Sequence, residues 1–118
     1  MSFDLVIFAN YKGVTELAVQ EAYSDSSIKW ESNAIYEDFI SNLFSVYPLL
    51  KHCDDVQLEE SPWANCEVCE GYVVLGFVST KEKSDPGFKF VLEQAEKLNL
   101  VIYDPQGAEA FVGEKRLS

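Results

Sequence analysis

The stretch between residues 72 and 103 constrains the fold more than any other part of the sequence, because it predicts a strand, a helix and a second strand in succession. Residues 72–79, Tyr-Val-Val-Leu-Gly-Phe-Val-Ser, combine β-branched and aromatic side chains and give the clearest strand pattern in the chain. Residues 100–103 give the second strand, and a turn follows it.

The helix between these two strands has a predicted start and a predicted end. Asp85 is expected to be the N-cap, with Pro86 at the first helical position, where the missing N–H of proline is tolerated. Asn99 can adopt the left-handed backbone conformation that ends a helix. The buried stripe of this helix consists of apolar residues three and four positions apart, namely Phe88, Val91, Leu92, Ala95 and Leu98.

The first half of the chain predicts one strand and two helices. Residues 3–9 are almost all apolar, which is typical of a strand that is covered on both faces. Residues 15–23 suit a short helix with Thr15 as its N-cap. Residues 33–47 predict a second helix, because their apolar side chains recur every three or four positions. Pro48 ends this helix, since the residue before a proline avoids the helical region.

A long acidic connection, residues 49–70, separates the two halves. Within it we expect only a short strand around residues 65–68 and a turn at residues 69–71. A structureless loop of this length is unusual in a compact domain and is often functional. Its acidic residues are Asp54, Asp55, Glu59, Glu60, Glu67 and Glu70, and no Lys or Arg lies between Lys51 and Lys81.

The order of these elements predicts a single α+β domain over residues 1–118. The length fits one domain with one ordinary hydrophobic core. We expect one mixed sheet of three to five strands, the last of them a short strand at residues 110–112, with about three helices packed on the sheet.

The charge of the chain bears on its partners. Twenty acidic residues stand against nine basic ones, which gives a net charge of −11. This charge argues against binding to nucleic acid or to an anionic membrane, since both require positive charge on the protein. It permits a basic protein partner, although composition alone is explained more simply by solubility. No apolar run approaches the ~20 residues that span a bilayer and the start lacks a signal-like pattern, so we expect a cytoplasmic protein.

A metal-binding interpretation would use His52, Cys53, Cys66 and Cys69. Cys66 and Cys69 have the C-x-x-C spacing found in zinc sites, but His52 and Cys53 are adjacent, and adjacent side chains rarely reach one metal ion. The other interpretation is three reduced cysteines that pack as small apolar side chains. We expect no metal site and no cofactor, and keep a metal-binding domain as an alternative hypothesis.

Patterns that would support catalysis are weak, so we expect a binding protein rather than an enzyme. The chain has a single His, and it contains neither a nucleophile-elbow sequence nor a phosphate-binding glycine loop. The carboxylate pairs Asp54-Asp55 and Glu59-Glu60 stand outside the loop patterns of calcium or acid–base sites. A solvated run of charge explains these pairs more simply.

Trp63 lies inside the acidic connection, in the sequence Ser61-Pro62-Trp63. A Trp between acidic residues resembles an interface anchor, because Trp supplies a large contact area and is enriched among binding hot spots. The alternative is that Trp63 folds back and fills the edge of the core. The residues that we expect to bind a partner are Asp54, Asp55, Glu59, Glu60, Trp63, Glu67 and Glu70.

A series of short segments between residues 34 and 107 resembles known proteins. In order, the segments are Tyr36-x-x-Phe39-x-x-x-Leu43, Tyr47-Pro48, Ser61-Pro62-Trp63, Gly71-Tyr72-Val73-Val74 and Leu98-Asn99-Leu100-Val101-Ile102-Tyr103-Asp104-Pro105-Gln106. Together they resemble a family of small bacterial proteins that end in a GL-x-x-YDPQ sequence after an amphipathic helix. Tyr103–Gln106 is the most specific element. Asn99 stands where the family has Gly, and the first thirty residues match only loosely.

Small acidic proteins of this kind are also similar to immunity proteins of bacterial toxin systems, including contact-dependent growth inhibition. That likeness implies a protein that binds and neutralises a cognate basic toxin domain, with a nuclease as the expected class. Likeness at this level does not determine function, so two alternatives stay open. One is a metal-binding or enzymatic domain that uses the His and Cys residues, and the other is a housekeeping adaptor without a toxin partner.

Overall fold

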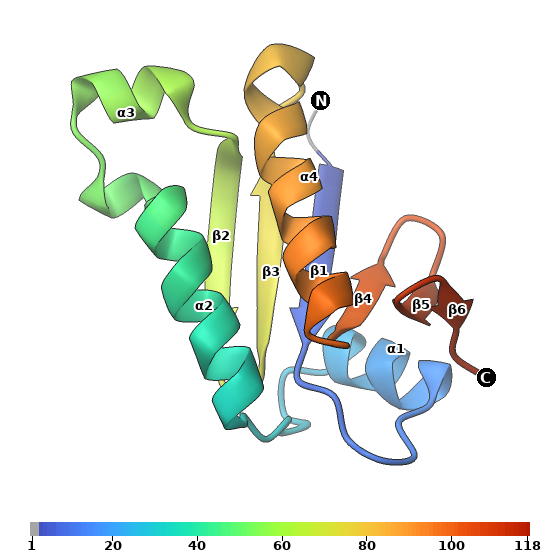
Figure 1. Ribbon diagram of the computed structural model, residues 1–118. Helices are drawn as coiled ribbons and strands as arrows, with labels where there is room; N and C mark the ends of the chain where they lie inside the picture. The colour runs from blue at the N-terminus through green and yellow to red at the C-terminus, as the bar shows by residue number, and fades with distance from the viewer. Residues whose placement is uncertain (1–2) are drawn as a thin grey trace.

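The computed structural model describes residues 3–118 and places six strands in one antiparallel sheet, in the order β2-β3-β1-β4-β5-β6 (Figure 1). Helices α2 and α4 cover the front face of the sheet, which is turned to the viewer in Figure 1, and α1 packs on the back. The strands are β1 (Phe3–Phe8), β2 (Trp63–Cys69), β3 (Tyr72–Phe77), β4 (Val101–Asp104), β5 (Glu109–Val112) and β6 (Lys115–Arg116). The helices are α1 (Glu16–Ser24), α2 (Ala34–Val46), the 3₁₀ helix η1 (Leu50–His52), α3 (Asp55–Glu60) and α4 (Lys81–Lys97).

The predicted α+β class is confirmed, but the sheet has more strands than the expected three to five, and it is antiparallel rather than mixed. The sheet is antiparallel because the crossover from β3 through α4 to β4 does not place these two strands side by side. Strand β1 lies between β3 and β4 and pairs antiparallel with both, so the two strands run in one direction without touching. No helix in residues 3–118 has the length and apolar character needed to cross a membrane.

Strand β1 is the centre of the molecule. Its residues from Leu5 to Phe8 are all buried, as the apolar sequence predicted for a strand covered on both faces. Because successive side chains of a strand point to opposite faces, Leu5 and Ile7 face α2 and α4, whereas Val6 and Phe8 face α1.

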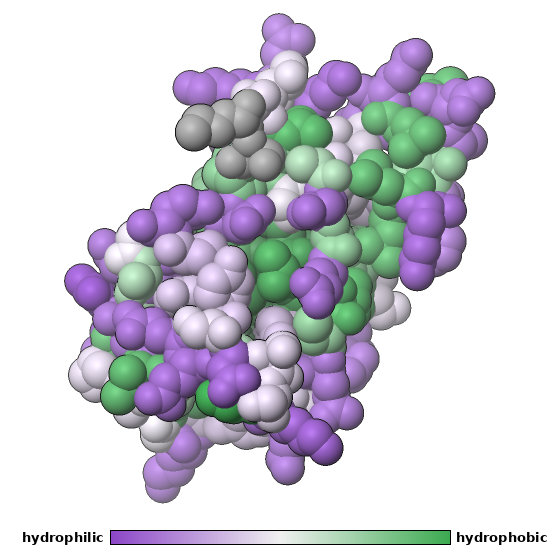
Figure 2. Space-filling model, turned by 180° about the vertical axis from the view of Figure 1, so that it is seen from behind, coloured by the Kyte–Doolittle hydropathy of each residue, from purple (hydrophilic) through white to green (hydrophobic). Residues whose placement is uncertain are grey.

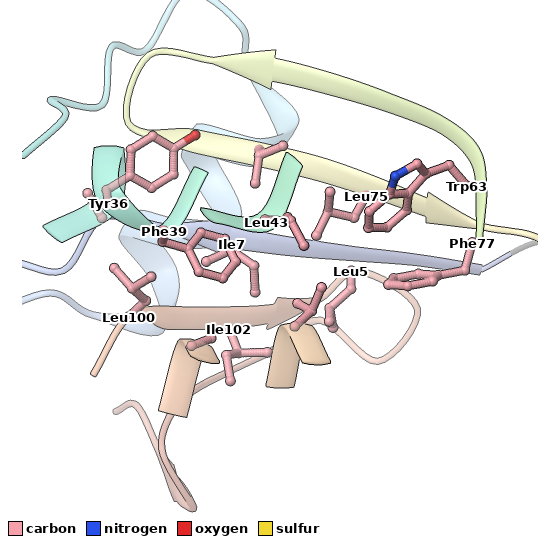
Figure 3. Close-up of a cluster of buried hydrophobic side chains, with 14 residues drawn as sticks. Leu5, Ile7, Tyr36, Phe39, Leu43, Trp63, Leu75, Phe77, Leu100 and Ile102 are labelled. Atoms are coloured by element: carbon pink, nitrogen blue, oxygen red, sulfur yellow. The ribbon is translucent and has the colours of Figure 1, made fainter. Parts of the chain in front are cut away.

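The larger part of the core lies between the sheet and its two front helices. Helix α2 begins at its N-cap Asn33, whose side chain accepts a hydrogen bond from the Tyr36 N–H at 2.9 Å. The same helix directs Tyr36, Phe39 and Leu43 onto the sheet, where they meet side chains from four strands (Figure 3). The labelled members of this cluster are Leu5, Ile7, Tyr36, Phe39, Leu43, Trp63, Leu75, Phe77, Leu100 and Ile102.

Helix α4 starts five residues earlier than the sequence predicted. Its first residue is Lys81, so Asp85 is not its N-cap and Pro86 lies inside the helix. Proline there removes one backbone hydrogen bond, a cost that the packing of the next residue can offset. Gly87 is buried against Pro62, and a Cβ at position 87 would lie 2.8 Å from the ring of Pro62. The predicted end is confirmed, since Asn99 has a φ of 54°.

The turn between β2 and β3 depends on Gly71. This residue has a φ of +80°, and a Cβ on it would lie 2.2 Å from the backbone oxygen of Trp30. The Trp30 backbone has little freedom to move away, because the Trp30 indole N–H donates a hydrogen bond to the Ala9 carbonyl at 2.8 Å. Gly71 also accepts a hydrogen bond from the Ala9 N–H at 2.8 Å, which ties the turn to the end of β1.

We predict that Gly71→Ala lowers the free energy of unfolding by about 3 kcal/mol or more, because it adds a backbone clash to the strain of a positive φ. The matched control is Gly113→Ala. Gly113 also has a positive φ, but nothing lies within 4 Å of the added Cβ, so we expect a loss of only about 1 kcal/mol. Urea unfolding of both variants measures the difference, and equal losses would contradict the role of the Trp30 contact.

The C-terminal strands are attached to α1 through Glu16. Its carboxylate accepts hydrogen bonds from Arg116 Nε at 2.9 Å and Arg116 Nη2 at 3.0 Å, and from the Ala110 N–H at 3.0 Å. The Arg116 hydrogen bonds, followed by the Ala110 N–H, lower the pKa of Glu16 from 4.5 to about 2. Because the folded pKa lies below the unfolded value, Glu16 stabilises the fold above about pH 4.5, and this contribution is lost as the pH falls toward 2.

We predict that Glu16→Gln reduces the free energy of unfolding at neutral pH, and that the gap to the wild type narrows between about pH 4.5 and pH 2. Glu21→Gln, a change at an exposed position of the same helix, is the control. Its free energy of unfolding should stay close to that of the wild type at every pH. Thermal or urea unfolding at several pH values measures both variants. A gap for Glu16→Gln that stays constant down to pH 2 would count against the proposed linkage.

Candidate interaction surface

The acidic segment, residues 54–70, begins with α3, a helix that the sequence did not predict. Asp54 and Gln57 form a capping box: the Asp54 carboxylate accepts from the Gln57 N–H at 2.8 Å, and the Gln57 side-chain oxygen accepts from the Asp54 N–H at 3.0 Å. No residue of α3 is buried, so no apolar stripe marks it in the sequence. The expected short strand at residues 65–68 is confirmed as part of β2, and the loop expected before it is corrected to η1 and α3.

The structure divides the predicted acidic residues into two groups. Asp54, Asp55, Glu59 and Glu60 lie on or next to α3, at the end of the molecule farthest from α1 (Figure 1). Glu67 lies on β2, and Glu70 lies in the turn to β3. All six side chains are exposed. The only ion pair within residues 3–118 joins Glu16 and Arg116, so none of the six carboxylates is neutralised by a neighbouring base.

Two apolar side chains lie between the acids of α3. Val56 is 64% exposed and Leu58 is 46% exposed. A six-residue helix that leaves both side chains in water offers apolar contact area surrounded by negative charge. Neither residue is among the binding residues expected from the sequence, although both stand between two pairs of acids there.

A second set of residues became apparent only in three dimensions. On the back of the sheet, Glu67 and Glu70 line a hollow of about 350 Å³ together with Ile28, Trp30 and Tyr72. Ile28 and Trp30 come from the loop before α2, whereas Glu67, Glu70 and Tyr72 come from the β2–β3 hairpin, so no local motif identifies the whole set. Figure 2 shows this side of the molecule, with hydrophobic atoms near its centre and hydrophilic side chains around them.

Trp63 does not lie on the interaction surface, and the expectation that it is an exposed anchor is wrong. The residue is only 2% exposed, and its indole N–H donates a hydrogen bond to the Tyr47 carbonyl at 2.9 Å. Its ring lies 5.1 Å from that of Phe77 and 6.0 Å from that of Phe44. The alternative interpretation, that Trp63 fills the edge of the core, describes its place in the structure (Figure 3).

In the structure, the four residues of the metal-site hypothesis, His52, Cys53, Cys66 and Cys69, do not come together. Cys66 and Cys69 are three residues apart on one strand, so their side chains point to opposite faces of the sheet. Cys66 pairs with Leu75 of the front cluster, and burial raises the pKa of its thiol to about 12. Cys53 donates to the Leu49 carbonyl at 3.3 Å, and His52 is exposed on η1. Within residues 3–118, no three His, Cys, Asp or Glu side chains are grouped to hold a metal ion.

We predict that Trp63→Ala lowers the free energy of unfolding by about 3–5 kcal/mol, as expected when a large aromatic side chain is removed from a core. Trp63→Phe retains most of the apolar contact and loses the hydrogen bond to Tyr47, so it should cost about 1 kcal/mol. Chemical unfolding of the two variants tests this order. A Trp63→Ala protein as stable as the wild type would be incompatible with the buried position.

Comparisons with known proteins reveal no relative for this arrangement. No protein-family model matches the chain, and neither a curated protein nor a solved structure matches it.

Proposed function

We propose that the chain is an immunity-type protein that binds a basic bacterial toxin domain, of the nuclease class, and neutralises it by direct contact. The observation that carries this proposal is α3, which holds unpaired carboxylates next to the exposed side chains of Val56 and Leu58. A toxin domain that acts on nucleic acid needs basic residues to contact phosphate. An acidic surface is complementary to such a domain and would cover the residues that it uses on its substrate.

The two kinds of side chain have different parts in this proposal. Unneutralised carboxylates attract a basic partner over a distance and raise the rate of association. Val56 and Leu58 supply apolar area that is removed from water once the partner has docked. Other parts of the surface would have to contribute as well, since a stable interface buries about 1,600 Å² in total.

The proposal places the protein in the cytoplasm, where an immunity protein meets an incoming toxin domain. It involves no catalytic step, no cofactor, no nucleic acid and no membrane. The net charge of −11 supports the last two points, because nucleic acid and the cytoplasmic membrane surface are both anionic.

The direct test is to express the product of the neighbouring gene and mix it with this chain. We expect a stoichiometric complex, loss of the toxic activity in the complex, and survival of cells that produce both proteins. A neighbouring product without toxicity, or a toxin whose activity is unaffected by the chain, would contradict the proposal.

We predict that the double variant Glu59→Lys and Glu60→Lys slows association with the toxin domain by about tenfold at low salt, with a smaller effect at 0.15 M, where charges are screened over about 8 Å. Glu59 and Glu60 are substituted because they lie outside the capping box of Asp54 and Gln57, so the start of α3 stays intact. Surface plasmon resonance measures the association rate.

The matched control is Glu93→Lys and Glu96→Lys, which changes the net charge by the same amount. Both residues are exposed on the half of α4 that lies away from α3 (Figure 1). We expect the control to keep most of the wild-type association rate. Equal slowing by the two double variants would show that net charge alone, rather than α3, guides the encounter.

A further inference from the structure

We propose that the outer edge of β2 receives an extended segment of the partner as an additional strand, and that basic and apolar side chains alternate along this segment. The inference rests on the proposed function for the identity of the partner. Its geometric basis is independent of that function, because it comes from the hydrogen bonds of β2 and from the two hollows beside it.

Strand β2 lies at one edge of the sheet and pairs only with β3. Its two ends have further hydrogen bonds: the Trp63 N–H donates to Ser61 Oγ at 3.2 Å, and the Cys69 carbonyl accepts from the Tyr36 hydroxyl at 3.2 Å. In the part of the chain that the structure describes, the backbone of residues 64–68 has no hydrogen bond outside the ladder with β3. An open row of N–H and C=O groups between two fixed ends is a template for a further strand.

The front side of this edge is mainly apolar, although Lys51 and Asn65 also line it. Cys66 and Val68 point to the front, and Val68 is 47% exposed. Together with Leu49 and Leu50 they line a hollow of about 360 Å³ next to β2. A strand added to the edge would direct every second side chain toward this hollow, and an apolar side chain there would be removed from water.

The back side of the edge is acidic and aromatic. Glu67 points to the back, where it lines the second hollow with Glu70, Trp30 and Tyr72. Lys29, the one base in the lining of this hollow, forms no ion pair with either carboxylate. Carboxylates beside the partly exposed rings of Trp30 and Tyr72 suit a Lys or Arg side chain, which pairs with the acids and stacks on the rings. The remaining side chains of the added strand would point here.

The charges also argue against a second copy of the chain as the occupant of this edge. The acidic segment carries six carboxylates and no Lys or Arg. If two copies paired through their β2 edges, both sets of carboxylates would lie along one seam, and like charges across paired strands are destabilising. A strand with basic side chains would instead be attracted to the carboxylates at this edge.

The test uses the full chain labelled with ¹⁵N and a capped heptapeptide, Val-Lys-Val-Lys-Val-Lys-Val. We expect NMR shift changes at residues 64–68 and slower exchange of the amides there. Two further peptides carry N-methyl groups, one on the valine amides and the other on the lysine amides. Because alternate N–H groups of a strand point to the same side, one methylated peptide should lose binding and the other should keep it.

The variant Glu67→Lys should weaken peptide binding about fivefold or more, since it replaces a cross-strand attraction by a repulsion. Glu114→Lys, at an exposed position beyond β5, is the matched control and should change binding less than twofold. Equal binding of the two methylated peptides would overturn the proposal, because it would indicate attraction without strand pairing. A chain that dimerises in sedimentation experiments with its own residues 64–68 protected would overturn it in favour of a second copy.

Hydrogen exchange on the complex with the toxin domain separates this inference from the proposed function. We expect protection at residues 64–68. If the toxin is neutralised while these amides exchange as in the free chain, the strand addition is wrong and the immunity function stands. If the peptide pairs with β2 but the chain neutralises no toxin, the binding edge stands and the immunity function is wrong.

Discussion

The burial of β1 on both faces is the constraint on which the rest of the structure depends. Leu5 and Ile7 need one apolar layer and Val6 and Phe8 need another, so the sheet must be covered on both sides. Helices α2 and α4 supply the front layer, and α1 supplies the back layer. With β1 at the centre, β3 and β4 become its two neighbours, and β2 is left at the edge.

This arrangement explains why the acidic segment lies on the surface and is nevertheless held in place. Trp63 stands between α3 and the exposed part of β2, and its ring is fixed by Phe77, Phe44 and the Tyr47 carbonyl. One buried side chain therefore fixes where α3 ends and where the sheet edge begins. The residues on either side can remain polar, because they contribute little to the core.

The sequence predicted those elements whose ends and buried faces are set by residues close to one another in the chain. Thr15 and the apolar spacing of residues 33–47 act locally, and the observed helices differ from the predicted ones by about one residue. The pairing of β1 with β3 and β4 depends on contacts between distant segments, and α3 has a cap but no buried face, so both escaped prediction. The six acids were predicted as surface residues, whereas Trp63 was misplaced, because a Trp between acids has the same local sequence in a core and at an interface.

A free sheet edge exposes a protein to pairing with its own copies, and the acids near β2 limit this risk without closing the edge. Their repulsion acts before two copies touch, because the field of unpaired charges extends over roughly 8 Å at physiological salt. The same field attracts a basic strand over the same distance. Glu67 is one of these acids and lies on the edge strand itself. In the proposed complex, a single distribution of charge would thus both disfavour pairing of two copies and attract the basic strand, which neither a covered edge nor a neutral one could do.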